Sequence, residues 1–266
     1  MISYLVTVRN GEEFIKPLLD NFSQQVGVND KIEVIIVDDG STDNTVEAIS
    51  RYCAKNLTLK LIKTEGVGRA KALNMALRES SKKYVGIMDV DDLAHPLKTD
   101  VQLQIALKSD SDFLFTDFKV FHDNKTPEND SIQLDEIDVR DVSGDGLFIR
   151  NPFFHSSMVA KRDTLNQLGG YDESLKKLVD YDLYLRASSK HFSFKVINSK
   201  LTYKRFHENQ SFEHKARHSY IQEVFKMQLR WILKSKKYQY LIFPPLKFTY
   251  SLLPQKFRSI LANNIK

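Results

Sequence analysis

The sequence is short of cysteine and of long apolar runs, and each shortage excludes a class of protein. Cys53 is the single cysteine among 266 residues, so no internal disulfide can form. A disulfide-stapled secreted scaffold is therefore excluded, and we expect a reducing, cytoplasmic compartment. No stretch reaches the ~18 consecutive apolar residues that a membrane-spanning helix needs. The opening residues MISYLVTVRN also lack the basic and then apolar pattern of a signal peptide, so we expect none.

Acidic residues are scarce towards the end of the chain. Residues 200–266 carry 14 Lys and Arg against 3 Asp and Glu, whereas the whole chain has a net charge of only +5. Such a basic surface keeps nucleic acid as one hypothetical partner, which predicts binding with a steep salt dependence. The sequence shows no internal repeat or low-complexity tract, and its 42% hydrophobic residues are ordinary for a globular protein. The length suits one large domain, or one domain with an appendage.

The first hundred residues alternate between apolar runs and amphipathic segments. The run from Ile32 to Val37 is almost entirely apolar, which is typical of a parallel strand covered on both faces. Residues 11–25 have helical spacing instead. The pattern predicts strands at 2–8, 32–37, 57–62 and 84–88 and helices at 11–25, 43–52 and 68–79. Four such units predict an α/β fold with a doubly wound, mainly parallel sheet flanked by helices.

The later part of the chain predicts shorter elements. We expect one or two strands at 113–121, short strands at 156–159 and 192–197, and helices at 96–107, 161–168 and 180–190. Residues 122–146 are polar and rich in Asp and Asn, which favours a mobile loop. Beyond about residue 205 the pattern becomes helical and basic.

Polar residues stand at three of the predicted strand ends, where ligands of doubly wound sheets bind. One end is acidic, because Asp89, Asp91 and Asp92 fall within four residues. Three carboxylates this close repel one another unless a cation neutralises them. Oxygen ligands favour Mg²⁺, Mn²⁺ or Ca²⁺. The alternative is a solvated turn whose aspartates cap the following helix, and the string alone leaves both interpretations open.

The second acidic end is Asp38-Asp39-Gly40-Ser41-Thr42-Asp43. An ionised carboxylate only accepts hydrogen bonds, so it suits the imide N–H of uracil or another base N–H. The alternative is turn and helix-cap chemistry, for which this composition is equally suitable. We favour the functional interpretation for Asp39 and leave both open for Ser41 and Asp43.

Seven strings, taken in order, resemble glycosyltransferase family 2 of the GT-A fold. They are TVRNGE (7–12), VDDGSTD (37–43), GVGRAKALNMAL (66–77), MDVDD (88–92), FFHSSMVAKRD (153–163), GGYDESL (169–175) and VDYDLYLRA (179–187). Any one string is weak, but the ordered set at these spacings is specific. The resemblance covers roughly residues 2–210 and extends to enzymes of bacterial surface-polysaccharide, O-antigen and capsule synthesis.

The resemblance implies a nucleotide site and a metal site. The residues implied at the nucleotide are Thr7, Arg9, Asp38, Asp39, Arg69, Lys71 and Asp89. Asp91 would be the principal ligand of Mn²⁺ or Mg²⁺, with Asp92 beside it. His207 lies in a Y-x-x-x-H segment that related enzymes often place near the metal or diphosphate, and imidazole is a competent Mn²⁺ ligand; the alternative, which we favour slightly, is an ordinary loop histidine. An aromatic residue is common at the position of Arg9, which puts a base-stacking contact in doubt.

The catalytic base implied by the resemblance is Asp180. The family transfers with inversion, by removing the proton of an acceptor hydroxyl as its oxygen attacks the sugar. The usual Glu-Asp pair is Val179-Asp180 here, so one carboxylate is missing. The alternative is that Asp180 is the N-cap of the predicted helix. Asp182 would orient the acceptor or serve the structure, and His155 would border the acceptor cleft or be a buried strand-edge histidine.

Residues 206–266 form a basic extension with two possible uses. Residues 215–237 predict an amphipathic helix, and Tyr238 to Leu253 is aromatic and apolar but interrupted by Pro244-Pro245. Aromatic residues flanked by Lys and Arg are typical of a peripheral position on an anionic membrane, here the inner face of the cell membrane. A helical subdomain packed on the sheet is the alternative. The string QLRW (228–231) is one residue short of the Q-x-x-R-W of processive polysaccharide synthases, which favours single addition.

The leading hypothesis is thus an inverting, metal-dependent hexosyltransferase-type enzyme with a catalytic domain at 1–205. It would move sugar from a nucleotide-diphosphate sugar, with UDP favoured, to a saccharide acceptor that is lipid-linked. A nucleotide-sugar-binding protein of impaired activity is a rival because of Val179. A sugar nucleotidyltransferase is another, but VRNGEEF after the first strand is not the Gly-rich phosphate loop it would need. We expect no nucleic-acid partner.

Overall fold

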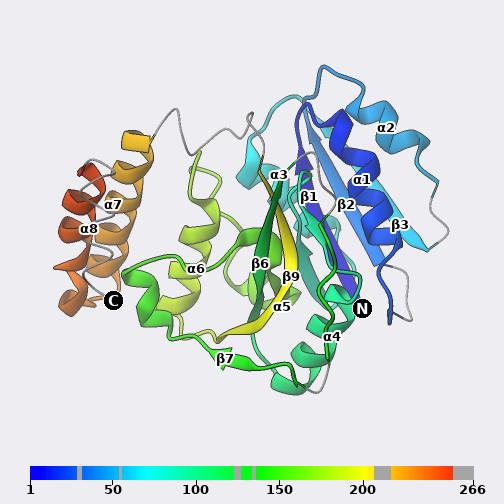
Figure 1. Ribbon diagram of the computed structural model, residues 1–266. Coiled ribbons are helices and arrows are strands. Elements are labelled where there is room, and N and C mark those ends of the chain that lie inside the picture. Colours follow the sequence, from blue (N-terminus) through cyan, green and yellow to red (C-terminus); the bar gives the residue numbers. More distant parts are fainter. Residues whose placement is uncertain (29–31, 54–55, 123–126, 134–135, 207–216, 254–266) are drawn as a thin grey trace.

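A nine-stranded sheet forms the centre of the molecule, in the order β3-β2-β1-β4-β8-β6-β9-β5 with β7 beside β9 (Figure 1). The computed structural model describes residues 1–266 except 29–31, 54–55, 123–126, 134–135, 207–216 and 254–266. The strands are β1 (Ile2–Val8), β2 (Ile32–Asp39), β3 (Leu57–Thr64), β4 (Tyr84–Ile87), β5 (Leu93–Ala94), β6 (Phe113–His122), β7 (Val139–Asp141), β8 (Val159–Lys161) and β9 (Phe194–Phe206). The helices are α1 (Glu12–Ser23), α2 (Thr45–Arg51), α3 (Arg69–Glu79), α4 (Lys98–Ser109), α5 (Arg162–Gln167), α6 (Val179–Ser189), α7 (Arg217–Lys234) and α8 (Phe243–Leu252), with short 3-10 turns η2 (Gly144–Phe148), η3 (His155–Ser157) and η4 (Tyr238–Tyr240).

The first four strands confirm the predicted parallel sheet. Strands β3, β2, β1 and β4 pair in parallel, and helices α1, α2 and α3 connect them in the predicted order. The chain moves outward from β1 to β3 and then returns to place β4 on the other side of β1. A crevice opens beyond the strand ends at such a reversal, which is where doubly wound sheets bind ligands. The β1 and β4 ends carry the Arg9 and Asp89 strings.

Alternation along the strands divides the core into two clusters, one on each face of the sheet. In β1, Leu5 belongs to the cluster that contains α3 and α6 residues, whereas Tyr4 and Val6 belong to the cluster that contains α1 and α4 residues. Successive strand residues point to opposite faces, so a run that is apolar throughout supplies both clusters. The near-continuous apolar runs of β1 and β2 are therefore consistent with their interior positions, each with a strand on both sides.

The second half of the sheet is mixed and corrects several sequence predictions. Strand β8 is antiparallel to β4 and β6, while β6 is parallel to β9. The strand predicted at 156–159 was wrong, because His155–Ser157 forms a 3-10 turn and β8 begins at Val159. The predicted loop at 122–146 contains β7 and the start of η2, and β9 continues to Phe206 rather than ending at 197. Strand β5 was missed, since two residues carry no detectable periodicity.

Helices α7 and α8 lie beside α6, at the end of the molecule opposite α2 (Figure 1). The Trp231 indole donates a hydrogen bond of 2.9 Å to Asp182 of α6, and Gln228 donates to the Tyr181 hydroxyl at 3.0 Å. Met227, Trp231 and Ile232 join the same buried cluster as α6. Pro244 and Pro245 occupy the first turn of α8, where a missing N–H costs nothing, so they begin a helix instead of breaking one. Within the described ranges, no helix is both long and apolar enough to cross a membrane.

Glu33 lies at the start of β2, at the opposite end of this strand from Asp38 and Asp39. It provides a test of what stabilises the fold. It is 2% exposed and accepts hydrogen bonds from the Ser3 hydroxyl and the Ser81 N–H, with Lys60 at 3.1 Å. Burial alone would raise its pKa, but these donors outweigh burial and lower the pKa to about 2. The carboxylate therefore stabilises the fold above the unfolded pKa of ~4.5, and this contribution is lost as pH falls towards 2.

We expect Glu33→Gln to lower the free energy of unfolding by about 3 kcal/mol at pH 7, from the size of that shift. The difference from wild type should shrink steadily between pH 5 and pH 2 (about the interval between the two pKa values), as measured by urea unfolding. Glu79→Gln, which changes an exposed carboxylate at the end of α3, is the control. A difference that does not depend on pH would contradict the assignment.

Candidate active site

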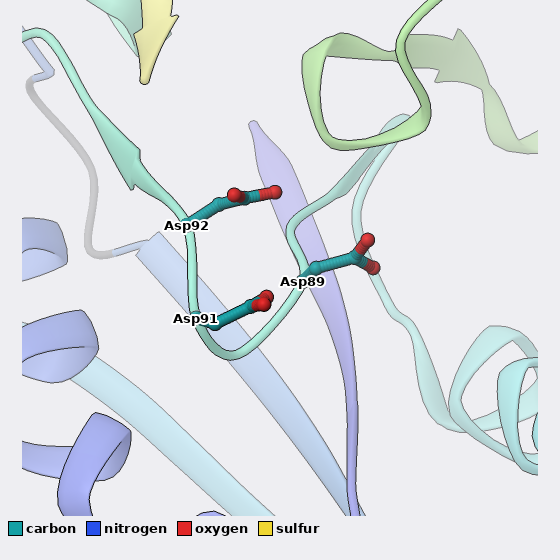
Figure 2. A group of neighbouring side chains, drawn as sticks. All are labelled: Asp89, Asp91 and Asp92. Atoms are coloured by element: carbon teal, nitrogen blue, oxygen red, sulfur yellow. The ribbon is translucent and has the colours of Figure 1, made fainter. Parts of the chain in front are cut away.

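Three aspartates stand on the turn that leaves β4 (Figure 2). Asp89, Asp91 and Asp92 each offer a carboxylate oxygen, and these oxygens lie within 4.8 Å of one another. Oxygens on opposite sides of a bound Mg²⁺ are about 4.2 Å apart, because each Mg–O bond is about 2.1 Å. A small side-chain adjustment would therefore let the cluster hold such an ion. The alternative of a simple helix cap is not realised, because Leu97, not an aspartate, precedes α4.

The three carboxylates are not equivalent. Asp92 is 2% exposed, and its two oxygens accept hydrogen bonds from the Ser156 hydroxyl at 2.6 Å and the Arg205 N–H at 3.0 Å. Burial raises the pKa of Asp92, and the charges of Asp89 and Asp91 raise it further. A divalent cation would relieve this crowding. Asp91 is only half-buried, so it is the better placed direct ligand.

Asp89 also contacts a basic side chain. It forms an ion pair with Arg69 at the start of α3, and this pair raises the pKa of Arg69. A second Arg69 contact, 3.4 Å long, reaches the Nδ1 atom of His155, whose Nε2 atom is 2.9 Å from the Tyr171 hydroxyl. Burial lowers the pKa of His155, so the imidazole is neutral at neutral pH. Arg69 is thus a fixed cation, 42% exposed, beside the acidic turn.

Asp180 lies close enough to this cluster for its charge to affect two of the groups. Its charge raises the pKa of Arg69 after the larger effect of Asp89, and it opposes the lowering of the His155 pKa by burial. Asp180 is the second residue of α6 and does not cap it, since Leu178 occupies the cap position. The N-cap alternative is therefore wrong. The Asp180 carboxylate accepts a hydrogen bond of 3.2 Å from Asn151.

The backbone before Asp180 has an unusual conformation. Leu178 has a φ of +58°, a left-handed conformation that costs a non-glycine residue ~1–2 kcal/mol. Val179 replaces the usual acid, and it is 4% exposed within the core. A carboxylate at that position would be buried without water, and the chain has an apolar side chain there instead.

The end of β2 forms the other border of the site. The Asp39 carboxylate accepts hydrogen bonds from Thr64, from Val67 N–H at 2.6 Å and from Gly68 N–H at 2.9 Å, so it holds the loop before α3. A carboxylate has about four acceptor positions, which leaves one for a ligand. Gly66 and Gly68 have φ near +90°, and an added Cβ at Gly66 would come within 3.9 Å of the Arg9 guanidinium.

The remaining residues predicted at the nucleotide or the metal differ in their burial. Asp38 is 3% exposed, and its Oδ1 atom has no hydrogen-bond partner among the described residues. Thr7 is half-buried in β1 and Lys71 is exposed on α3. His207 lies outside the described residues.

Asp182 was predicted either to orient the acceptor or to serve the structure, and its contacts are structural. It is 1% exposed and forms an ion pair of 2.8 Å with Arg186, in addition to its bond with Trp231. Arg186 in turn donates to the carbonyl groups of Leu168 and Gly170 at 2.7 Å. The carboxylate therefore joins α6 to α7 and does not face the cleft.

Sequence reasoning missed four residues of the site: Asn151, Ser156, Tyr171 and Arg205. Ser156 and Tyr171 lie inside strings that matched the family pattern, so their positions were visible although their roles were not. Asn151 and Arg205 lie outside every matched string. Arg205 donates to the Asp91 carbonyl at 2.8 Å and thereby fixes the end of β9 against the acidic turn after β4.

Comparison with known proteins agrees with this arrangement. Residues 3–167 match the family model described as glycosyl transferase family 2. An uncharacterized glycosyltransferase of Methanocaldococcus jannaschii is 24% identical over 88% of this chain and 79% of its own length. The amylovoran biosynthesis glycosyltransferase AmsE of Erwinia amylovora is 27% identical over 71% of this chain and 70% of its own length. The chain spans 62% of two further relatives from Rickettsia.

Two solved structures share the fold. Staphylococcus aureus TarS, residues 1–349, in complex with UDP-GlcNAc aligns over 94% of this chain and 72% of its own, with a TM-score of 0.71 and 21% identity. The mannosyltransferase PcManGT of Pyrobaculum calidifontis, in complex with GDP-Man and Mn²⁺, aligns over 99% and 79% with a TM-score of 0.64 and 20% identity.

The family model covers well over half of the chain. The chain belongs to glycosyltransferase family 2. It is a glycosyltransferase with the GT-A fold and a helical C-terminal extension.

Proposed function

We propose that this glycosyltransferase moves a sugar from a UDP-sugar to the hydroxyl of a lipid-linked saccharide, with inversion and with a divalent metal. The observation that carries the proposal is the proximity of Asp89, Arg69 and Asp180, which come from three separate elements. A single displacement needs a leaving-group site and a base on opposite sides of the sugar. The acidic turn and the start of α6 supply these two sides.

The proposed roles of the protein groups follow from their contacts. Arg69 would bind a donor phosphate, because a guanidinium fits phosphate oxygens and this one is held in place by Asp89. Asp180 would take the acceptor proton, and Asn151 would hold its carboxylate in position. His155 is neutral and buried, and we place it at the border of the acceptor cleft.

The metal would be Mn²⁺ or Mg²⁺, held by Asp91 with Asp92 beside it. When bound, a divalent cation neutralises charge that develops on a departing diphosphate. The oxygen-only donor set of the turn fits such hard ions. The complex of PcManGT with Mn²⁺ supports this choice of ion.

Uracil is the base we propose for the donor, with Asp38 and Asp39 as acceptors for its imide N–H. The unpartnered oxygen of Asp38 and the remaining acceptor position of Asp39 support this. The UDP-GlcNAc complex of TarS supports a UDP-sugar, and the amylovoran function of AmsE supports an acceptor in bacterial surface-polysaccharide synthesis.

Peripheral contact with an anionic membrane is the proposed use of α8. Four exposed apolar side chains follow a helical spacing of i, i+4, i+8 and i+11 along it: Ile242, Leu246, Tyr250 and Leu253. Lys234 and Lys236 lie nearby in sequence and add positive charge. Amphipathic helices of this kind lie in the membrane interface with their basic residues at the headgroups.

A thermal-shift comparison of UDP, GDP, CDP and dTDP tests the donor, each with Mn²⁺ or with EDTA. UDP with Mn²⁺ at about 100 times Kd should stabilise the fold by ~2.7 kcal/mol, which raises Tm by about 5–10 °C in a domain of this size. EDTA should remove most of the shift. A larger shift with GDP than with UDP would contradict the uracil assignment, and equal shifts in EDTA would contradict the metal.

A further inference from the structure

The hydroxyl group of Tyr184, on α6, is buried and unpaired among the described residues. Tyr184 is 0% exposed, and its hydroxyl has no hydrogen-bond partner within the ranges that the structure describes. The rings of Phe115 and Phe153 meet the Tyr184 ring edge-on, with centroids 5.3 and 5.4 Å away, and hold it in place. Buried polar groups are paired as a rule, and phenylalanine would fill this place without an unpaired group. The hydroxyl therefore indicates a partner beyond the contacts described so far.

Helix α6 places Tyr184 one turn after Asp180, on the same face. Residues four apart are neighbours on a helix surface, and each side chain leans towards the turn before its own. Asp182 and Arg186 have the same spacing on this helix, and they form an ion pair of 2.8 Å. Asn151 donates to the Oδ2 atom of Asp180, whereas no hydrogen bond to Oδ1 comes from the described part of the chain. The Tyr184 side chain thus leans towards a carboxylate with an acceptor to spare.

A second phenol, that of Tyr171, has a proton whose direction follows from the donors around it. Arg69 can only donate, so the Nδ1 atom of His155, 3.4 Å from this guanidinium, must accept. The neutral imidazole then carries its proton on Nε2 and donates it to the Tyr171 oxygen, 2.9 Å away. Because that oxygen accepts, the Tyr171 O–H is left as a donor, and no residue in the described ranges accepts from it.

The Tyr171 and Tyr184 hydroxyls are thus two buried donors around one histidine. The His155 ring lies edge-on to both phenol rings, with centroids 5.7 Å from Tyr171 and 6.4 Å from Tyr184. Burial raises the pKa of both phenols, so both keep their protons at neutral pH. Two donors this close to each other can share one acceptor, or one water that passes their bonds on.

Two carboxylates lie near enough to these phenols to be that acceptor. The charges of Asp180 and Asp89 both oppose ionisation of the phenols, after the larger effect of burial. Asp89 is already paired with the Arg69 guanidinium. Asp180 stands one helical turn from Tyr184 and has the spare Oδ1 atom, so it is the acceptor that the contacts favour.

We infer that Tyr171 and Tyr184 are positioning residues for the proposed base. Their O–H groups bind the Oδ1 atom of Asp180, directly or through one buried water, while Asn151 binds Oδ2. A carboxylate has about four acceptor positions, so positions remain for the proton of the attacking hydroxyl. A base acts only within hydrogen-bond reach of that proton, which makes its orientation part of the rate. The inference rests on the proposed role of Asp180 and concerns how this carboxylate is held.

Tyr184→Phe tests the inference in the full chain, by UDP release from UDP-GlcNAc in Mn²⁺ with water as the acceptor. We expect the rate to fall about tenfold, less than when the base itself is lost, because the carboxylate remains but is no longer held. UDP affinity, measured by calorimetry, should stay within about twofold of wild type. Tyr4→Phe is the matched control and should keep the wild-type rate. It removes an equally buried hydroxyl, which bonds Thr99 at 3.0 Å on the opposite face of the sheet.

The double variant of Tyr184→Phe with Asp180→Asn separates positioning from a general loss of structure. If Tyr184 acts through Asp180, its substitution should cost nothing further once the base is absent, whereas independent effects multiply. Multiplied losses, a normal rate in Tyr184→Phe, or equal losses in Tyr184→Phe and Tyr4→Phe would overturn the inference. If Asp180→Asn alone keeps the wild-type rate, or wild type releases no UDP, the proposed function fails and the positioning role fails with it.

Nitrogen NMR of the full chain with isotope-labelled histidine tests the direction of the Tyr171 proton. His155, identified by the signal that His155→Gln removes, should carry its proton on Nε2. Tyr171→Phe should shift this Nε2–H signal, because the proton loses its acceptor, and Tyr4→Phe should leave it in place. A proton on Nδ1, or a signal that Tyr171→Phe does not move, would exclude Tyr171 from the positioning of Asp180.

Discussion

Asp180→Asn is expected to lower the transfer rate by about 10²–10⁴-fold, the range that a positioned general base contributes. Asparagine has the shape of aspartate but cannot take a proton, and Asn151 can still bond its side-chain oxygen. The donor side of the cleft is formed by other elements, so UDP affinity with Mn²⁺ should stay within about twofold of wild type, since distant sites act independently. The measurement is UDP release in the presence of an acceptor, with UDP binding followed separately by calorimetry.

Asp163→Asn is the matched control for the Asp180 experiment. It makes the same carboxylate-to-amide change at an exposed position in the first turn of α5. Its transfer rate should equal that of wild type. A normal rate in Asp180→Asn would remove Asp180 from the mechanism, whereas a loss of both rate and UDP binding would show that the substitution disturbs the whole cleft.

Asp91→Ala is expected to weaken UDP binding by about 100-fold or more in Mn²⁺, since even residues that only support metal ligands cost 10–100-fold. Asp91 is the half-buried carboxylate of the turn, while the oxygens of Asp92 are engaged by Ser156 and Arg205. In EDTA the variant and wild type should bind UDP equally weakly. Calorimetric titrations with UDP, in EDTA and at a series of Mn²⁺ concentrations, measure the two affinities.

The same titrations at a series of Mn²⁺ concentrations, made on Asp92→Asn, measure the contribution of Asp92. Asp92→Asn should reduce stability more than Mn²⁺ dependence, because an amide cannot accept from both donors that the carboxylate serves. A retained Mn²⁺ dependence in Asp91→Ala would show that the metal is not held by this residue. Equal loss in both variants would mean that the two aspartates hold the ion jointly.

The sequence was sufficient for the parallel half of the fold and for most of the site. Apolar runs such as IEVIIV mark central strands, because both faces of each strand are buried. The aspartates after β2 and β4 could be located because strand ends meet at one edge of the sheet. The resemblance carried by the ordered strings then predicted Asp180 at the same site.

Contacts that depend on backbone pairing or on distant segments could not be predicted. Strands β5 and β7 have two and three residues and exist because β9 offers them hydrogen bonds. Asn198 and Lys200 interrupt the apolar pattern of β9, which concealed its second half. The pairing of Asp182 with Trp231 joins residues 49 positions apart, and no local pattern indicates such a partner.

The bond between Trp231 and Asp182 has a consequence for how this enzyme could be diversified. Asp182 lies on the helix that presents Asp180, and it also fixes Arg186, which bonds the carbonyl groups of Leu168 and Gly170. An exchange of the extension that did not bring an equivalent indole N–H would leave a buried carboxylate with one donor fewer. The extension and the placement of α6 are thus coupled, and recombination between relatives would be tolerated at the β2 and β3 end of the chain more readily than at the junction with α7.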